Sequence, residues 1–292
     1  MRDPLAIEYP PALADTLQTF CDAVGLPTLA PHLHEFVLAF VLYEGLMLLG
    51  PFFGNTFVGN AYRALSRRTR LNFDIHIVSQ VQCILILALA FPVFWDLDVQ
   101  DDHLFSYSPY AGLVYAFAIG YFAWDSYISI KYIKWFGVGF AVHGIASFCV
   151  FLLSFKPFLM YYGPWFLMFE ISTPFLNVHW FATHLPAGAV PEKVQVVNGV
   201  LLLVSFFFAR IIWGFYSVGV LALDMYHNLG DAPLWMPLIV LSSNFSLDCL
   251  NVYWFSKMIS ALQRRMAATK AGKKDIPDLL NEEEDIKGHK ME

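Results

Sequence analysis

The sequence has few charged residues. Asp, Glu, Lys and Arg make up 14% of its 292 residues, whereas about 25% is usual for a soluble domain. The basic residues also form no clustered basic face of the kind that binds nucleic acid. The composition therefore argues against an ordinary soluble domain and against a nucleic-acid partner.

Cysteine is scarce as well, and the spacing expected for a metal site is missing. The four cysteines are spread along the chain and define no disulfide framework. No HxxxH or HExxH motif is present, so we expect no metal ion and no other cofactor. Residues 1–33 carry acidic residues and prolines where a cleavable signal peptide would have a basic start and an apolar core.

Long apolar runs are what the chain does contain. Hydrophobic residues make up 58% of the sequence, and the mean hydropathy is +0.54. Runs of about 20 apolar residues are long enough to cross a bilayer as helices. We therefore predict an all-α, multi-pass membrane protein with seven transmembrane helices in one bundle, near residues 34–53, 73–94, 111–130, 136–155, 158–181, 194–223 and 234–260.

These runs divide the chain into four parts. Residues 1–33 are an N-terminal segment with a short amphipathic helix expected at 11–24. Residues 34–59 hold the first span and the start of a loop, residues 60–262 hold the other six spans, and residues 263–292 form a charged tail. Lys and Arg mark the cytosolic loops of membrane proteins. Their alternation along this chain predicts a luminal N-terminus and a cytosolic C-terminus.

The predicted fifth span carries an unusual set of polar residues. Glu170 lies inside an apolar run, where an ionisable side chain normally faces a partner or a cavity because its exposure to lipid is costly. On a regular helix Glu170, Thr173 and Asn177 would share one face. Pro174 removes a backbone donor and is expected to kink the helix. The pattern predicts a polar interior surrounded by the other spans.

Further polar residues lie in the cytosolic half of the predicted spans. His76, Gln80, Asp125, His143 and Asn251 share this depth. Each could be an ordinary interhelical hydrogen-bond partner, although a histidine or carboxylate can also act as an acid or base. Another ionisable residue, Arg210, falls near the middle of the sixth span, and we expect it to neutralise Glu170 or Asp248.

Several motifs, occurring in a characteristic order, resemble those of the TLC-domain family, which includes ceramide synthases and the translocating-chain-associated protein. The resemblance covers roughly residues 60–262 and is closest to small TLC-domain proteins of lipid homeostasis. The matching residues are Asn72-Phe73-Asp74-Ile75-His76, Trp124-Asp125, His143, Glu170-Ile171-Ser172-Thr173-Pro174-Phe175-Leu176-Asn177 and Asn251-Val252-Tyr253-Trp254-Phe255.

The resemblance implies an endoplasmic-reticulum protein whose helices form a closed bundle around a cavity open to the cytosol. In ceramide synthases this region carries paired histidines and aspartates that transfer an acyl group from acyl-CoA to an amine. Here His143 stands between Val142 and Gly144, so the doubled histidine is missing. The resemblance therefore supports the family's fold for this chain more strongly than it supports the acyltransferase activity.

Three functions remain open. The first is a lipid-homeostasis protein that binds a membrane acyl lipid, with Glu170, Asn177, Gln80 and Asn251 at the lipid head group. The second is an acyl-CoA-dependent N-acyltransferase, with acyl-CoA as substrate and His143, Asp125 and His76 as catalytic residues. In this enzyme His76 or His143 would be the general base, and Asp125 would orient it. The third is a cargo receptor or translocation accessory protein with a membrane-protein partner. A homo-oligomer is compatible with each.

Overall fold

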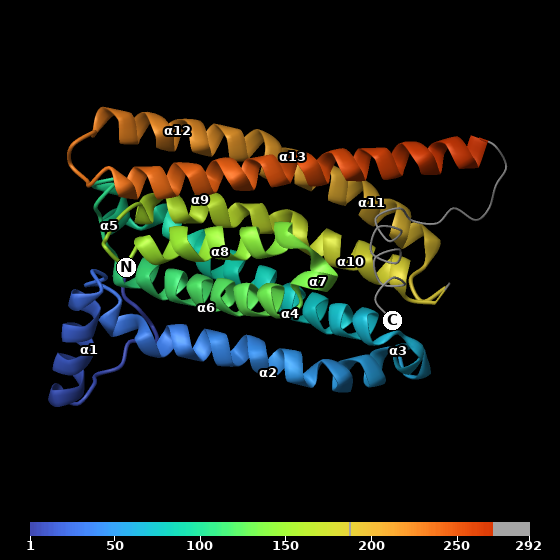
Figure 1. Ribbon diagram of the computed structural model, residues 1–292, viewed down its shortest axis with the longest axis horizontal. Coiled ribbons are helices and arrows are strands. Elements are labelled where there is room, and N and C mark those ends of the chain that lie inside the picture. Colours follow the sequence, from blue (N-terminus) through green and yellow to red (C-terminus); the bar gives the residue numbers. More distant parts are fainter. Residues whose placement is uncertain (187, 271–292) are drawn as a thin grey trace.

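The computed structural model describes residues 1–186 and 188–270, and within them every regular element longer than an isolated bridge is a helix. The long helices run side by side along one axis (Figure 1). The α-helices are α1 (Pro11–Ala23), α2 (Leu33–Phe57), α3 (Asn60–Ala64), α4 (Arg67–Ala90), α5 (Leu97–Gln100), α6 (Pro109–Lys131), α7 (Ile133–Phe136), α8 (Val138–Leu153), α9 (Gly163–Leu167), α10 (Thr173–His184), α11 (Glu192–Phe206), α12 (Trp213–His227) and α13 (Trp235–Lys270).

Four helical segments of the described chain are long and apolar enough to cross a membrane. They are Ala30–Phe57, Arg67–Trp95, Pro109–Lys131 and Glu192–His227. They coincide with the spans predicted at 34–53, 73–94, 111–130 and 194–223, which confirms the all-helical membrane class. The other three predicted spans correspond to the shorter apolar helix α8, to a broken helical segment that includes α9 and α10, and to the long helix α13.

Local sequence explains where the long helices begin. The Ser66 side chain accepts a hydrogen bond from the backbone N–H of Thr69 at 3.2 Å and caps α4. Helix α6 begins with Pro109, whose missing N–H has no cost in the first turn of a helix. Helix α6 is also the most enclosed of the apolar helices, and it packs mainly against α2 and α8. It therefore forms the centre of the hydrophobic core.

The predicted fifth span is interrupted near its middle. After α9 the chain forms a 3₁₀ turn at Met168–Ser172, and α10 then begins at Thr173 with Pro174 in its first turn. A proline fits there because the first helical N–H groups have no partner within the helix. The tighter 3₁₀ winding also changes the direction in which successive side chains point. Glu170 and Asn177 consequently do not share one regular helical face.

The predicted sixth span contains a second irregularity. Helices α11 and α12 are joined by a π-helical segment at Phe207–Ile212, which carries Arg210. Single π-helical turns within α-helices are rare and occur frequently at functional sites. The two irregular segments, Met168–Ser172 and Phe207–Ile212, contact each other.

The two ends of the bundle differ in what they carry. Helices α1 and α5 lie at one end, and α3 lies at the other (Figure 1). The short helix predicted at 11–24 is present as α1. Helix α13 continues to Lys270, into the part predicted as a tail, and the rest of that tail, residues 271–292, lies outside the described residues.

Candidate functional site

Three of the polar residues singled out in the sequence form one hydrogen-bonded network between α4 and α10. His76 Nδ1 lies 2.8 Å from Asn177 Oδ1. The Asn177 amide donates to Gln80 Oε1 at 3.1 Å and to Ser79 Oγ at 3.3 Å. Asn177 is 1% exposed, so these bonds satisfy an amide that would otherwise be costly to bury. The network therefore joins the two helices through buried polar side chains.

The network also determines which nitrogen of the His76 ring carries a proton. Asn177 Oδ1 can only accept a hydrogen bond, so Nδ1 of His76 carries the proton. The imidazole stacks on Trp180, with ring centroids 4.5 Å apart. His76 is thereby held in one orientation between an amide and an aromatic ring.

A second group of polar residues lines a small cavity inside the bundle. Its volume is about 40 Å³, which is room for a polar group or a few water molecules and far less than an acyl chain requires. The walls come from α6, α8, α9, the two irregular segments and α13. The polar lining residues are His143, Ser147, Glu170, Arg210, Asn244 and Asn251.

Arg210 is the most highly connected side chain of this cavity. Its Nε donates to Ser172 Oγ at 2.9 Å and its Nη2 donates to Thr173 Oγ1 at 3.2 Å. Its Nη1 approaches Asn251 Oδ1 at 3.5 Å. All three partners are neutral, although Arg210 is only 7% exposed.

The sequence predicted that Arg210 would neutralise Glu170 or Asp248. In the described part of the chain Arg210 forms no direct ion pair with either carboxylate, although Glu170 lines the same cavity. The reason is geometric, because the 3₁₀ turn presents the hydroxyls of Ser172 and Thr173 to the guanidinium. The cavity therefore contains a buried positive charge and a negative charge that are not directly paired.

The residues expected to form a catalytic pair lie on neighbouring helices but are not joined. His143 lines the cavity, and its ring lies edge-on to Trp254 at 5.9 Å. Asp125 lies against the next residue of α8, since a Cβ atom on Gly144 would lie 2.7 Å from Asp125 Oδ2. No hydrogen bond connects His143 to Asp125 within the described residues. The expected pairing of a histidine base with Asp125 is therefore absent as a direct hydrogen bond between His143 and Asp125.

A larger hollow at the α3 end of the bundle was not predicted as a site. It has a volume of about 340 Å³, and its lining includes Arg63, Arg67 and Arg70. Beside them Tyr62 donates to Asp74 Oδ1 at 2.9 Å. Burial, together with the nearby Asp74, raises the pKa of Tyr62 well above its ordinary value, so this hydroxyl stays protonated. The arginines were visible in the sequence, but there they served only to predict membrane orientation.

The fold and the polar interior together define an all-helical membrane protein with ionisable groups inside its bundle. Comparison with known families supports this class and makes it specific. Residues 72–260 match the model of the TLC domain, close to the range of 60–262 that the sequence motifs suggested. The chain belongs to the TLC-domain family.

Individual relatives agree with this assignment. A TLC domain-containing protein of Schizosaccharomyces pombe is 40% identical over 88% of this chain and 87% of its own length. Topoisomerase I damage affected protein 4 of Saccharomyces cerevisiae is 32% identical over 78% of this chain and 83% of its own. Human TLC domain-containing protein 4 is 29% identical over 76% and 85%. No solved structure matches the chain.

Proposed function

We propose that this TLC-domain protein acts in lipid homeostasis by binding the head group of a zwitterionic phospholipid in the cavity around Arg210 and Glu170. The observation that carries the proposal is the state of Arg210, which is buried and hydrogen-bonded only to neutral groups. Burying a charge without a counter-ion costs several kcal/mol. A phosphate accepting from Arg210 would offset that cost.

Glu170 would bind the positively charged group of the lipid head group, as Arg210 would bind the phosphate. Its carboxylate lines the same cavity and suits the ammonium group that follows the phosphate in a zwitterionic head group. Only this polar end fits a volume of about 40 Å³, so the acyl chains would remain among the apolar helix surfaces. Asn251 would help to hold the phosphate, whereas Asn177 and Gln80, bound to each other, would support the wall.

The finer features of the membrane arrangement belong to the same proposal. We place the protein in the endoplasmic-reticulum membrane with seven spans in a closed bundle, a luminal N-terminus and a cytosolic C-terminus. The segments beyond the four apolar helices support this arrangement, because α8, the broken α9–α10 segment and α13 each run along the bundle (Figure 1). A cavity reached from the cytosol would allow exchange with the leaflet that faces it.

The test is mass spectrometry of the lipids that co-purify with the detergent-solubilised protein. We expect wild type to retain a zwitterionic phospholipid, and the Arg210→Gln variant and the Glu170→Gln/His143→Ala double variant to lose most of it. Arg67→Gln is the matched control, since Arg67 is an exposed arginine of the α3-end hollow. Its lipid content should equal that of wild type.

Three other outcomes would contradict the proposal. Equal phospholipid content in wild type and Arg210→Gln would remove the head-group site. Product formation from labelled acyl-CoA that is lost in His143→Ala would favour the acyltransferase. Wild type that carries no lipid, but co-purifies stoichiometrically with another membrane protein, would favour the cargo-receptor function.

A further inference from the structure

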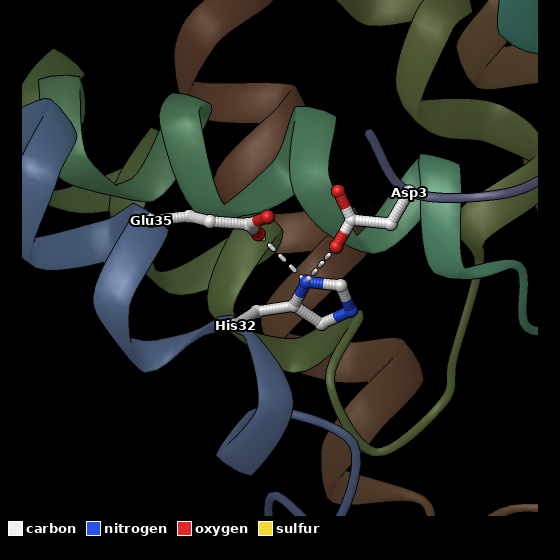
Figure 2. A group of neighbouring side chains, drawn as sticks. All are labelled: Asp3, His32 and Glu35. Atoms are coloured by element: carbon white, nitrogen blue, oxygen red, sulfur yellow. Dashed lines mark hydrogen bonds and ion pairs between the residues drawn. The ribbon is translucent and has the colours of Figure 1, made fainter. Parts of the chain in front are cut away.

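A cluster of three potential metal ligands lies at the α1 end of the bundle, away from the cavity of Arg210. Asp3 comes from the N-terminal segment, His32 from the 3₁₀ turn Ala30–His32, and Glu35 from the first turn of α2. Figure 2 shows both carboxylates directed at the Nδ1 edge of the His32 ring. His32 Nδ1 lies 2.7 Å from Glu35 Oε2 and 3.7 Å from Asp3 Oδ2.

This cluster is enclosed by protein. The side chains of Asp3, His32 and Glu35 are 4%, 1% and 0% exposed. Two carboxylates this close to each other repel, and burial strengthens the repulsion because water no longer screens it. The ion-pair partners of Asp3 and Glu35 among the described residues are histidines. With both carboxylates ionised, a neutral histidine would leave the negative charge of the cluster uncompensated.

His34, the other histidine near Glu35, makes no hydrogen bond to its carboxylate among the described residues. Its Nε2 lies 2.9 Å from the carbonyl oxygen of Leu5, which can only accept, so the Nε2 proton is directed at Leu5, and Glu35 Oε1 lies 3.7 Å from the same nitrogen. Its Nδ1 lies 3.0 Å from the Tyr9 hydroxyl, which itself accepts from the His34 backbone N–H. The Tyr9 proton is therefore available to His34 Nδ1.

One oxygen of Glu35 remains without a hydrogen-bond partner. Glu35 Oε2 contacts His32, whereas Oε1 is buried and has no hydrogen-bond partner among the described residues, although His34 Nε2 lies 3.7 Å from it. A buried carboxylate oxygen without a donor is costly, and such an orphan calls for a missing ligand. The unpaired oxygen belongs to the same carboxylate that already contacts His32 Nδ1.

The surroundings of His32 resemble the support of a metal-bound imidazole. His32 Nε2 lies 2.8 Å from the Tyr107 hydroxyl. With a metal on Nδ1, the remaining ring proton would lie on Nε2 and donate to Tyr107, as second-shell partners of metal-bound histidines do.

The opposite side of the ring is kept open by a glycine. A Cβ atom on Gly112 of α6 would lie 2.1 Å from His32 Nε2. Any other residue at position 112 would displace the imidazole from its present place. The position of His32 thus depends on α6 as well as on its own helix.

We infer that Asp3, His32 and Glu35 form a binding site for Zn²⁺. One imidazole nitrogen and carboxylate oxygens are donors that zinc accepts, at about 2.0–2.2 Å. Ligand atoms around such an ion lie roughly 3–3.5 Å apart, and the three donor atoms here already lie within 4.8 Å of one another. A modest inward shift of Asp3, with a slight separation of His32 Nδ1 from Glu35 Oε2, now 2.7 Å apart, would bring the three donors around one ion. The ion would fasten the N-terminal segment to α2.

The sequence predicted no metal ion, and the proposed zinc site departs from that prediction. Zinc would replace the proton on His32 Nδ1, so binding would release that proton and weaken at low pH. The ion would also neutralise the two carboxylates and give Glu35 Oε1 a partner. This site does not depend on the proposed lipid function.

The experiment measures zinc in the full-length protein. The chain is purified in detergent without chelator from cells supplied with zinc, and its metal content is determined by plasma mass spectrometry. We expect a zinc content near one ion per chain for wild type. After chelator treatment, ZnCl₂ should raise the temperature of thermal unfolding in a concentration-dependent manner.

Two conservative variants and one control make the result specific. Asp3→Asn and Glu35→Gln keep the size of each side chain and should weaken zinc binding by more than about tenfold. His227→Ala removes an exposed histidine of α12 and should bind zinc as wild type does. Circular dichroism of the chelated variants would verify that they remain folded.

The inference would be overturned by wild type that takes up no zinc, or by Asp3→Asn and Glu35→Gln binding as tightly as wild type. Tighter binding of Ca²⁺ or Mg²⁺ than of Zn²⁺ would overturn the zinc assignment. Because the first measurement uses unaltered protein, a variant that fails to fold does not prevent the test.

Discussion

Arg210 Nε donates a hydrogen bond of 2.9 Å to Ser172 Oγ, and this bond joins the π-helical segment to the 3₁₀ turn. Two irregular segments far apart in the sequence thus meet at one buried guanidinium. The irregular winding places Arg210 and Glu170 around one cavity without pairing them directly.

Removal of this acceptor should destabilise the protein. Ser172→Ala leaves Nε of Arg210 buried without its partner, and we expect a loss of about 1–3 kcal/mol in the free energy of unfolding. Ser242→Ala is the matched control, because the exposed Ser242 hydroxyl bonds only within its own helix. Thermal unfolding in detergent should separate the two variants. Equal stability would mean that Arg210 finds another acceptor at no cost.

The network of Asn177 should be equally sensitive. Asn177→Ala removes the partner of His76 Nδ1 and of Gln80 Oε1, with an expected loss of about 1–3 kcal/mol. Since His76 stacks on Trp180, a change in tryptophan fluorescence should accompany the loss. Asn228→Ala, which alters an exposed asparagine at the end of α12, should change neither quantity. An unaltered unfolding temperature for Asn177→Ala would show that the network is not needed for stability.

Gly112 offers a test of the packing around His32. Gly112→Ala would place a Cβ atom 2.1 Å from His32 Nε2, so we expect lower stability and, if the zinc inference holds, weaker zinc binding. Gly199→Ala is a control in a helix where the added atom meets nothing within 4 Å. There alanine should be neutral or stabilising by up to about 1 kcal/mol. If both variants behave alike, His32 can move away without cost.

The raised pKa of Tyr107 predicts that the stability of the fold decreases at alkaline pH. Its pKa is raised from 10.0 to about 12 by burial and by the nearby carboxylates. A raised pKa in the folded state means that the stabilisation is fully present below pH 10 and is lost as the pH rises from about 10 to about 12. In Tyr107→Phe this part of the decline should disappear. Unfolding temperatures of both proteins between pH 9 and pH 12 provide the comparison, and parallel curves would rule out a contribution from Tyr107.

Much of the polar site could be predicted from the sequence because helical spacing and depth are local properties. His76 and Gln80 are four residues apart on one helix, and Asn177 was predicted at the same depth. The hydrogen bonds from Asn177 to these two residues therefore required only that α4 and α10 be neighbours. The predicted common face of Glu170 and Asn177 depended on unbroken helical winding. The 3₁₀ turn before Pro174 breaks that winding, which a regular helical repeat cannot represent.

By itself the sequence determined the class of the protein. Apolar runs of bilayer length require helices, since backbone groups in lipid must be paired within the segment, and the motifs between residues 72 and 260 determine the family. Only the tertiary structure decided which ionisable groups meet. Arg210 meets Ser172 and Thr173 instead of a carboxylate, and Asp3 reaches His32 and Glu35 across the end of the bundle. Such meetings depend on how helices pack and where they are irregular, and neither follows from the spacing of residues along the chain.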